Sequence, residues 1–241
     1  MTIFGLDSAG KTAGVALVRD GRLLYEATLS AGLTHSETLL PLCQAAFAAT
    51  GLTPAGVDLF AASAGPGSFT GLRIGLATVK GLAMAAGKPC AGVSTLEALC
   101  WGVPLWGDVL CALDARRGEV YWAAFRVTQE KGAAQVLRLH EDASAPAASQ
   151  ADVLAGMEGP VTLLGDGAHL VYEALAPAGA ARLRLAPEAF RTGRAAGVCF
   201  AAQNGAQAVS AADLVPRYHR LSQAQRERAA RLGLAESEND A

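Results

Sequence analysis

The sequence lacks the residue patterns that form disulfide frameworks and metal sites. Its five cysteines are odd in number and include no C-x-x-C pair, which argues against paired disulfides and a zinc ribbon. No two of its four histidines, and no histidine with a cysteine, fall at metal-ligand spacing. We therefore expect no metal site. The cysteine usage indicates a reducing compartment, which we take to be the cytoplasm.

Long apolar runs and an excess of one charge are also absent. Alanine-rich stretches such as "VKGLAMAAG" are interrupted by Gly, Lys or Arg before they reach the roughly 18 apolar residues that a membrane span needs. The first residues do not resemble a cleavable signal. A net charge of −2 and a pI near 6.1 provide no overall basic field for nucleic acid. We expect no membrane segment, and any RNA contact to be shared with a partner.

Catalytic motifs are equally scarce. The chain has no G-x-S-x-G nucleophile elbow. Asp114 follows the apolar run "VLCAL" as a Walker B acid would, but the following "ARRGE" favours a hairpin turn. With 241 residues and 51% apolar content the chain can bury one large core or two modest ones. The chain is therefore large enough to be an enzyme, but its sequence contains no recognisable group of catalytic residues.

One motif that is present is "GLDSAGKT" at residues 5–12, which satisfies the Walker A pattern. That pattern binds phosphate only where a helix begins at the lysine. The residues after Lys11 instead alternate about an Asp20-Gly21 pair, which is a strong hairpin signal. The Walker interpretation is therefore disfavoured. Three consecutive strands are predicted, over 2–7, 14–19 and 22–29.

Asp7 and Ser8 then lie where one strand turns into the next. Such a turn can present amides and a hydroxyl to a phosphate, as in actin-like proteins and sugar kinases. It can equally be a plain hairpin turn whose side chains satisfy local amides. Both interpretations remain open at this point.

Capping signals place two helices in the first half of the chain. Thr34 and Glu37 have capping-box spacing, which predicts a helix ending at Gly51 and kinked at Pro41. A buried strand is predicted over 56–64, followed by the glycine-rich "AGPGSFTGLRIG" and a helix over 68–87. Ser68 or Thr70 would cap that helix.

The glycines of this second helix have two interpretations. They could bring backbone amides close to an anion. Alternatively, Gly71 and Gly75 form a small-xxx-small face that lets another helix approach closely, and this packing interpretation is favoured. Arg73 and Lys80 share a different face. The apolar face comprises Leu72, Leu76, Val79, Ala83 and Ala86.

The second half of the chain is predicted to form a β-rich unit. After a strand and helix start in "KPCAGVSTLEAL", the composition shifts at 100–108, where we place a domain boundary. The predicted elements are a hairpin with turn "DARRGE", a strand "AQVLRLHE", a loop "DASAPAASQ", a strand-turn-helix over 161–175, a helix over 187–208 and an extended "PRYHR". The expected units are residues 1–100, residues 101–221 with the last segment packing back on the first unit, and a charged tail over 222–241.

Several segments together resemble one family. Six of them occur in order along the chain: "HSETLLP", "GPGSFTGLRIG", "VSTLEAL", "LDARRGEVY", "GDGA" and "PRYHR". In this series the sequence resembles the bacterial TsaB (YeaZ) family from end to end, apart from the tail after Leu221. The resemblance implies an α/β fold of the actin/Hsp70-like ATPase class (ASKHA, RNase H-like) in two lobes.

The resemblance also implies a role in making threonylcarbamoyladenosine beside the tRNA anticodon, as a non-catalytic subunit. The paralogue TsaD carries a metal-binding H-x-x-x-H in a segment resembling "GVNHLEGH". The present chain reads "GVSTLEAL", so Thr95 and Leu99 stand where the histidines would be, and neither side chain can replace an imidazole ligand. The alternative is an independent ATPase or sugar-kinase-like enzyme that uses Asp7 and Ser8. We expect no resident cofactor, and at most nucleotide binding that is weak or shared with a partner.

The partners implied by the resemblance are TsaD, a TsaE-type ATPase in the same complex, tRNA through that complex, and a second copy of the chain when TsaD is absent. The family's partner surface is formed by its first two helices, which correspond to residues 35–50 and 68–87. The residues expected on it are His35, Leu39, Leu42, Gly71, Leu72, Arg73, Gly75, Leu76, Val79 and Lys80.

Overall fold

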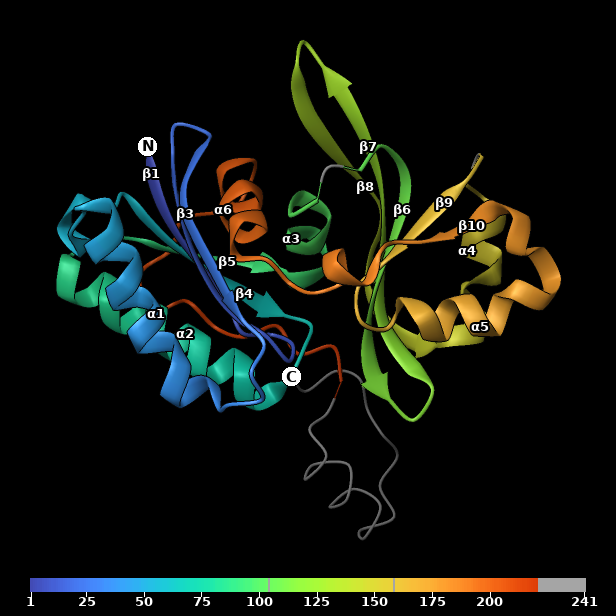
Figure 1. Ribbon diagram of the computed structural model, residues 1–241, viewed down its shortest axis with the longest axis horizontal. Coiled ribbons are helices and arrows are strands. Elements are labelled where there is room, and N and C mark those ends of the chain that lie inside the picture. Colours follow the sequence, from blue (N-terminus) through green and yellow to red (C-terminus); the bar gives the residue numbers. More distant parts are fainter. Residues whose placement is uncertain (104, 158, 221–241) are drawn as a thin grey trace, which may run out of the picture.

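The computed structural model describes residues 1–103, 105–157 and 159–220, and these residues form two five-stranded sheets with helices on both faces of each (Figure 1). Two helices cover the outer face of the first sheet, and two more lie between the sheets. A further pair covers the outer face of the second sheet. The α/β fold in two lobes is confirmed. In the described residues no helix is long and apolar enough to cross a membrane.

The first sheet has the order β3-β2-β1-β4-β5. Its strands are β1 (Thr2–Asp7), β2 (Ala13–Arg19), β3 (Arg22–Leu29), β4 (Leu59–Gly65) and β5 (Cys90–Ser94). The first three form the antiparallel meander predicted around Asp20-Gly21, and β4 pairs in parallel with β1 and β5. The predicted strand over 56–64 starts too early, because Pro54–Gly56 forms a 3₁₀ turn with Pro54 at its first position.

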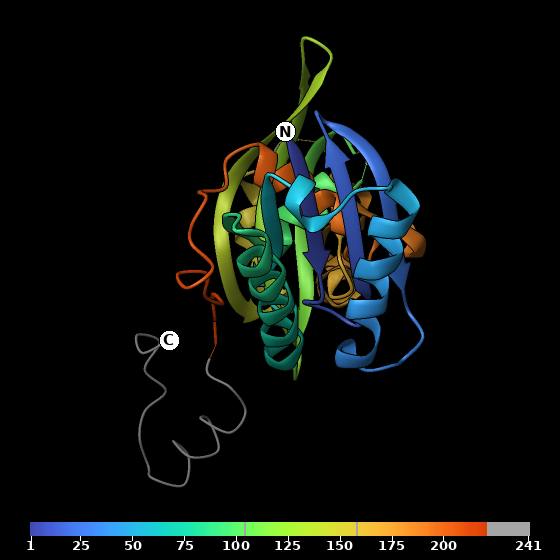
Figure 2. The same cartoon turned by 90° about the vertical axis from the view of Figure 1, so that its left-hand side faces the viewer.

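Helices α1 (His35–Thr50) and α2 (Phe69–Ala86) cover the outer face of this sheet, side by side (Figure 2). The predicted capping box at Thr34 and Glu37 is present, and Gly51 ends α1 in the left-handed conformation with φ 66°. Ser68 caps α2 by accepting a hydrogen bond from the Gly71 amide at 3.3 Å. Both predicted helices are confirmed within a residue or two of their bounds.

The layer between the sheets consists of α3 (Thr95–Trp101) and α6 (Ala195–Gln203). Small side chains let α6 lie close to the first sheet, since a Cβ on Gly5 would lie 2.5 Å from the Cys199 sulfur. The helix predicted over 187–208 is much shorter in the structure. Its first residues instead form a separate 3₁₀ turn, Glu188–Phe190, after Pro187.

The second sheet has the order β10-β9-β6-β7-β8. Its strands are β6 (Gly107–Arg116), β7 (Glu119–Glu130), β8 (Ala133–Pro146), β9 (Val161–Leu164) and β10 (Leu183–Leu185). Helices α4 (Ala151–Ala155) and α5 (Ala168–Gly179) cover its outer face. The predicted hairpin and the strand-turn-helix are confirmed. The loop predicted at "DASAPAASQ" is wrong, because β8 continues along β7 until Pro146 pairs with Glu119.

The last described segment, residues 210–220, runs from the first lobe to the second, and we call it the strap. It begins beside β5, where Cys90 and Val209 exchange two backbone hydrogen bonds of 2.8 Å. The Arg217 amide then donates to the Ala64 carbonyl at 2.7 Å. Arg220 contacts the second lobe through the Ala115 carbonyl at 2.9 Å and Glu119 at 2.7 Å. The predicted tail over 222–241 lies outside the described residues.

Candidate functional site

A cleft of about 260 Å³ lies between the lobes. The first lobe contributes Ala9, Gly10 and Lys11 from the β1–β2 turn and Gly67 and Ser68 from the loop before α2. The second lobe contributes Leu113, Asp114, Ala115, Arg116, Tyr121 and Asp166. Because residues from both lobes line this cleft, it is the place to look for a ligand that the two lobes would share.

The side chains of Asp7 and Ser8 are turned into the protein rather than into the cleft. Asp7 is 3% exposed and Ser8 is 2% exposed. The Ser8 hydroxyl donates to the Gly71 carbonyl at 2.9 Å, and Asp7 Oδ1 accepts from the Ala9 amide at 3.2 Å. Both side chains therefore already have partners within the chain. The Asp7 bond satisfies an amide of the turn itself, whereas Ser8 bonds to α2.

The glycine-rich loop closes over this turn. The Ser68 amide donates to the Ala9 carbonyl at 2.7 Å. A Cβ on Gly67 would lie 2.5 Å from the same carbonyl oxygen. The backbone of the loop therefore occupies the space directly above the turn. Gly67 is required there by this close approach.

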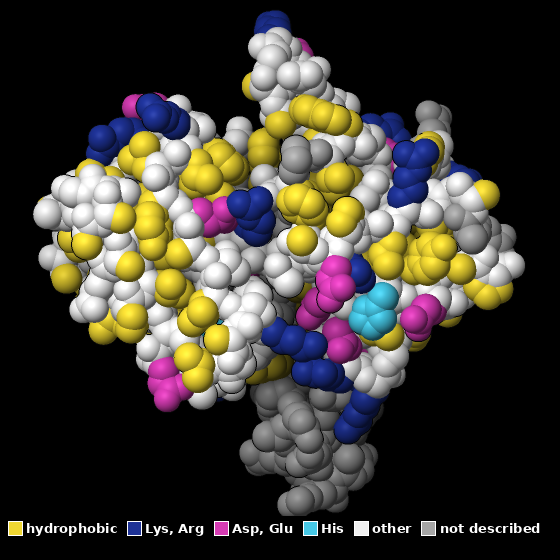
Figure 3. Space-filling model, viewed as in Figure 1, with side chains coloured by type: hydrophobic (Ala, Val, Ile, Leu, Met, Phe, Trp, Pro, Cys, Tyr) yellow, Lys and Arg dark blue, Asp and Glu magenta, His cyan; other side chains and the backbone are white. Residues whose placement is uncertain are grey.

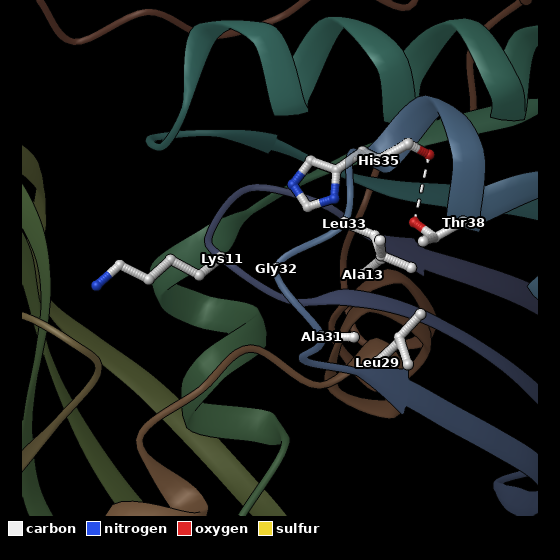
Figure 4. Close-up of a pocket in the computed structure, with 8 residues that line it drawn as sticks. All are labelled: Lys11, Ala13, Leu29, Ala31, Gly32, Leu33, His35 and Thr38. Carbon is white, nitrogen blue, oxygen red and sulfur yellow. Dashed lines mark hydrogen bonds between the residues drawn. The ribbon is translucent and has the colours of Figure 1, made fainter.

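Lys11 does not begin a helix, since β2 starts two residues later. The Walker A interpretation thus fails in the structure, as the sequence predicted. Figure 4 shows the Lys11 side chain extending away from His35, Thr38 and Leu29. Lys11 is exposed and lines the interlobe cleft.

The two acidic side chains that line the cleft accept hydrogen bonds from backbone amides of the second lobe. Asp114 Oδ1 accepts from the Arg116 amide at 2.7 Å, and Asp166 Oδ1 accepts from the Asp114 amide at 3.0 Å. Asp114 pairs with Val120 near the end of β6, and the predicted hairpin turn follows it at Arg117 and Gly118. Within the described ranges, no group of three or more His, Cys, Asp or Glu residues is placed to hold a metal ion.

Burial raises the pKa of the Asp7 carboxyl above its ordinary value of 3.8, and a hydrogen bond from the Ala9 amide offsets this only in part. Between the ordinary and the raised pKa, the native chain holds a proton that the unfolded chain has lost. The free energy of unfolding therefore falls as pH rises through this interval.

Replacing Asp7 with asparagine should remove this pH-dependent loss of stability. The asparagine side chain keeps an oxygen that can accept from the Ala9 amide but carries no charge to bury. We expect the stability of Asp7→Asn relative to the wild type to increase as pH rises above 3.8, the ordinary pKa of the carboxyl, towards its raised pKa. Urea unfolding at several pH values measures this. A relative stability that stays constant, or falls with pH, would contradict the assignment.

The interpretation of Gly71 and Gly75 as a contact between chains is wrong. A Cβ on Gly71 would overlap the Ser8 carbonyl oxygen, and a Cβ on Gly75 would overlap the Ser8 hydroxyl oxygen. The glycines do permit a close approach, but what approaches α2 is the β1–β2 turn of the same chain. They allow the bond between the Ser8 hydroxyl and the Gly71 carbonyl to form.

Most apolar residues predicted for the partner surface also face inward. The four that are at most 3% exposed are Leu39, Leu72, Leu76 and Val79. Leu76 and Val79 of α2 pack in the core against the first sheet, and Leu42 is half-buried at the edge of the same core. His35 is also half-buried, with Nε2 3.1 Å from the Gly10 carbonyl. Assigning the buried leucines and Val79 to a surface between chains is therefore a second error, made because helical periodicity does not say what covers a face.

The outer surface of α1 and α2 consists of other residues. Its most exposed apolar side chains are Leu40 at 53% and Met84 at 70%. Smaller exposed residues of the same two helices include Pro41, Ala45, Ala77 and Gly81. Figure 3 views these helices from the side, and the edge that it shows is mostly apolar or uncharged. Leu40 and Met84 are thus exposed apolar side chains on two adjacent helices.

Arg73 and Lys80, predicted on a separate face of α2, both contact the strap. Lys80 Nζ donates to the Leu214 carbonyl at 3.0 Å. Arg73 Nε donates to the Tyr218 hydroxyl at 2.7 Å, and the Tyr218 ring stacks on Phe69. Helical spacing could not predict these contacts, because the strap lies far from α2 in the sequence. Tyr218 nevertheless belongs to "PRYHR", one of the six segments singled out above.

Thr95 and Leu99 lie on α3 in the layer between the sheets. They are 3% and 2% exposed. Leu99 packs in the core between α3 and the second sheet, with Leu96 and Cys100. Leu99 therefore serves packing, while Thr95 is buried with no hydrogen-bond partner for its hydroxyl among the described residues.

A comparison with protein families finds one matching family model. It is described as "TsaD: tRNA N6-adenosine threonylcarbamoyltransferase" and matches residues 30–225. Among individual relatives, the "tRNA threonylcarbamoyladenosine biosynthesis protein TsaB" of Escherichia coli is 38% identical over 131 residues. The protein of the same name in Bacillus subtilis is 32% identical over 127 residues.

These two alignments cover 52% of the chain and 55% or 56% of the relatives, so the chain spans about half the length of the curated relatives it matches. The agreement with a solved structure extends further. YeaZ from Pseudomonas aeruginosa superposes with a TM-score of 0.72 at 26% identity, covering 90% of the chain and 99% of that structure.

Proposed function

The chain belongs to the TsaD family of tRNA N6-adenosine threonylcarbamoyltransferases, as a TsaB (YeaZ) member, and from this we propose that it is a non-catalytic subunit for threonylcarbamoylation of tRNA. In this role it binds and activates a TsaD-type protein, which performs the transfer. The observation that carries the proposal is the burial of Thr95 and Leu99. The positions that would supply imidazole ligands in TsaD here supply side chains to the core.

The proposed contact with the TsaD-type protein is the outer surface of α1 and α2. Leu40 and Met84 can bury apolar area there without any change in the chain's own core. A second copy of the chain would use the same surface when the TsaD-type protein is absent. A TsaE-type ATPase and tRNA would join through the assembled complex.

The test has two parts, both with the intact chain. The untagged protein should co-elute with the TsaD-type protein from the same genome in size-exclusion chromatography. It should also restore threonylcarbamoyladenosine in tRNA from cells depleted of the endogenous TsaB, but form none in vitro without the TsaD-type protein. Modification of tRNA by the chain alone would overturn the non-catalytic role. Failure to bind any TsaD-type protein would overturn the partnership.

The alternative function, an independent ATPase or sugar kinase, would need an open phosphate site at Asp7 and Ser8. The Ser8 hydroxyl and the Asp7 carboxyl have partners within the chain, and the Ser68 amide is bonded to Ala9. One observation favours this alternative: Lys11 is an exposed cation that lines the interlobe cleft. We propose that the chain has no resident cofactor and that any nucleotide it binds is either weakly held or shared with a partner.

Lys11→Ala tests that alternative. We expect this variant to support tRNA modification at nearly the wild-type level, because no phosphate-binding helix follows the lysine. The measurement is the threonylcarbamoyladenosine content of tRNA in a depleted strain that expresses the variant. Loss of modification with normal folding and normal partner binding would instead support a phosphate-binding role for Lys11.

A further inference from the structure

Tyr218 of the strap and Phe69 of α2 hold the Arg73 side chain. The two rings stack with centroids 4.2 Å apart and planes at 10°. Arg73 Nε donates to the Tyr218 hydroxyl at 2.7 Å. The guanidinium carbon lies 5.6 Å from the Tyr218 ring centroid and 5.9 Å from that of Phe69, within reach of a cation–π attraction. An exposed arginine is thus held in one arrangement.

The positive charge of Arg73 is not neutralised by the residues that the structure describes. Across these residues, the ion pairs within 4 Å involve other cations and leave Arg73 without a carboxylate. Its Nε bonds to Tyr218, while the two terminal nitrogens make no hydrogen bond to a described residue. A guanidinium with free terminal nitrogens is suited to pair with a planar, charged acceptor such as a carboxylate.

The surroundings favour a protein carboxylate over an RNA phosphate. Arg73 is an exposed residue of α2, the helix that also carries the exposed Ala77 and Met84. The chain has a net charge of −2 and so no overall field that would attract a polyanion. The cations near Arg73 are Lys80 on the same face of α2 and Arg217 beside Tyr218 on the strap. Arginine is enriched in protein–protein contacts.

We propose that Tyr218 is a positioning residue, which fixes Arg73 for an ion pair with an Asp or Glu of the protein partner that covers the outer surface of α1 and α2. This inference rests on the proposed function, because it requires that a partner binds there. Holding the side chain before binding reduces the conformational entropy lost when the ion pair forms. Because Arg220 of the strap bonds to Glu119, the second lobe helps to hold Tyr218 in place.

The test is a double-mutant cycle on binding to the TsaD-type protein from the same genome, measured by titration calorimetry at several salt concentrations. The variants are Arg73→Met, Tyr218→Phe and the double variant. Arg184→Met, which removes an exposed arginine from β10 in the second lobe, is the charge-matched control. Tyr218→Phe keeps the ring stack and removes only the hydroxyl.

We expect Arg73→Met to weaken binding roughly 10-fold to 100-fold and to reduce its salt dependence, as for a lost charged hydrogen bond. Tyr218→Phe should weaken binding roughly 2-fold to 10-fold without lowering the thermal midpoint. In the Arg73→Met background the tyrosine change should have no further effect. The control should bind like the wild type.

Other outcomes overturn the inference in distinguishable ways. Wild-type affinity of Arg73→Met, or additive effects of the two changes, would refute the positioning role and leave the proposed function standing. A loss confined to tRNA binding by the complex would assign Arg73 to a phosphate instead. If the wild-type chain itself binds no TsaD-type protein, the inference falls together with the proposed function.

Discussion

Gly75→Ala should lower the free energy of unfolding by about 1–3 kcal/mol, the range for overpacking a filled core. A Cβ at this position would overlap the Ser8 hydroxyl oxygen and lie 2.9 Å from Leu6 Cδ2. To admit it, α2 must move away from β1 or the Ser8 hydroxyl must leave the Gly71 carbonyl. Urea unfolding of the purified variant measures the loss.

Gly81 on the same helix is the matched control. A Cβ there meets no atom within 4 Å, so Gly81→Ala should gain up to about 1 kcal/mol from better helix propensity. A loss of stability in Gly75→Ala together with a gain in Gly81→Ala would separate the effect of packing from that of helix propensity. If both variants gained stability, the close approach of Ser8 to α2 would be refuted.

Local signals in the sequence were sufficient for most of the first lobe. The Asp20-Gly21 pair predicted the meander, and the residues around Thr34 and Ser68 predicted where both helices start, because turns and caps depend on nearby residues. The second lobe shows the limit of such signals. Alanine, serine and proline over 142–150 suggested a loop, yet pairing with β7 extends β8 to Pro146, since tertiary context outweighs strand propensity.

The site was predicted less well because its contacts join distant parts of the chain. Helical spacing identified a glycine stripe at Gly71 and Gly75 but could not show that Ser8 lies against it, 63 residues from Gly71. In the same way, Arg73 and Tyr218 meet across 145 residues. The helical periodicity predicted the buried face of α2 correctly, but it could not show which part of the chain covers that face.

Met84→Arg is expected to abolish stable association with the TsaD-type protein while leaving the chain folded. Met84 is 70% exposed, so the free chain accommodates the charge in water. In the complex an arginine there would be buried without a counterion, at a cost of about 3 kcal/mol or more, which is roughly a 100-fold loss of affinity. Leu40→Arg on α1 should behave alike if both helices contribute to one surface.

The control for these two variants is Leu137→Arg on β8, which adds the same charge at a side chain 60% exposed on the other lobe. Light scattering with and without the TsaD-type protein gives the association state, and circular dichroism verifies folding. The control should bind like the wild type. Loss of binding in all three variants would mean that the added charge acts without regard to position. Wild-type affinity of both Met84→Arg and Leu40→Arg would mean that the partner binds away from the outer surface of α1 and α2.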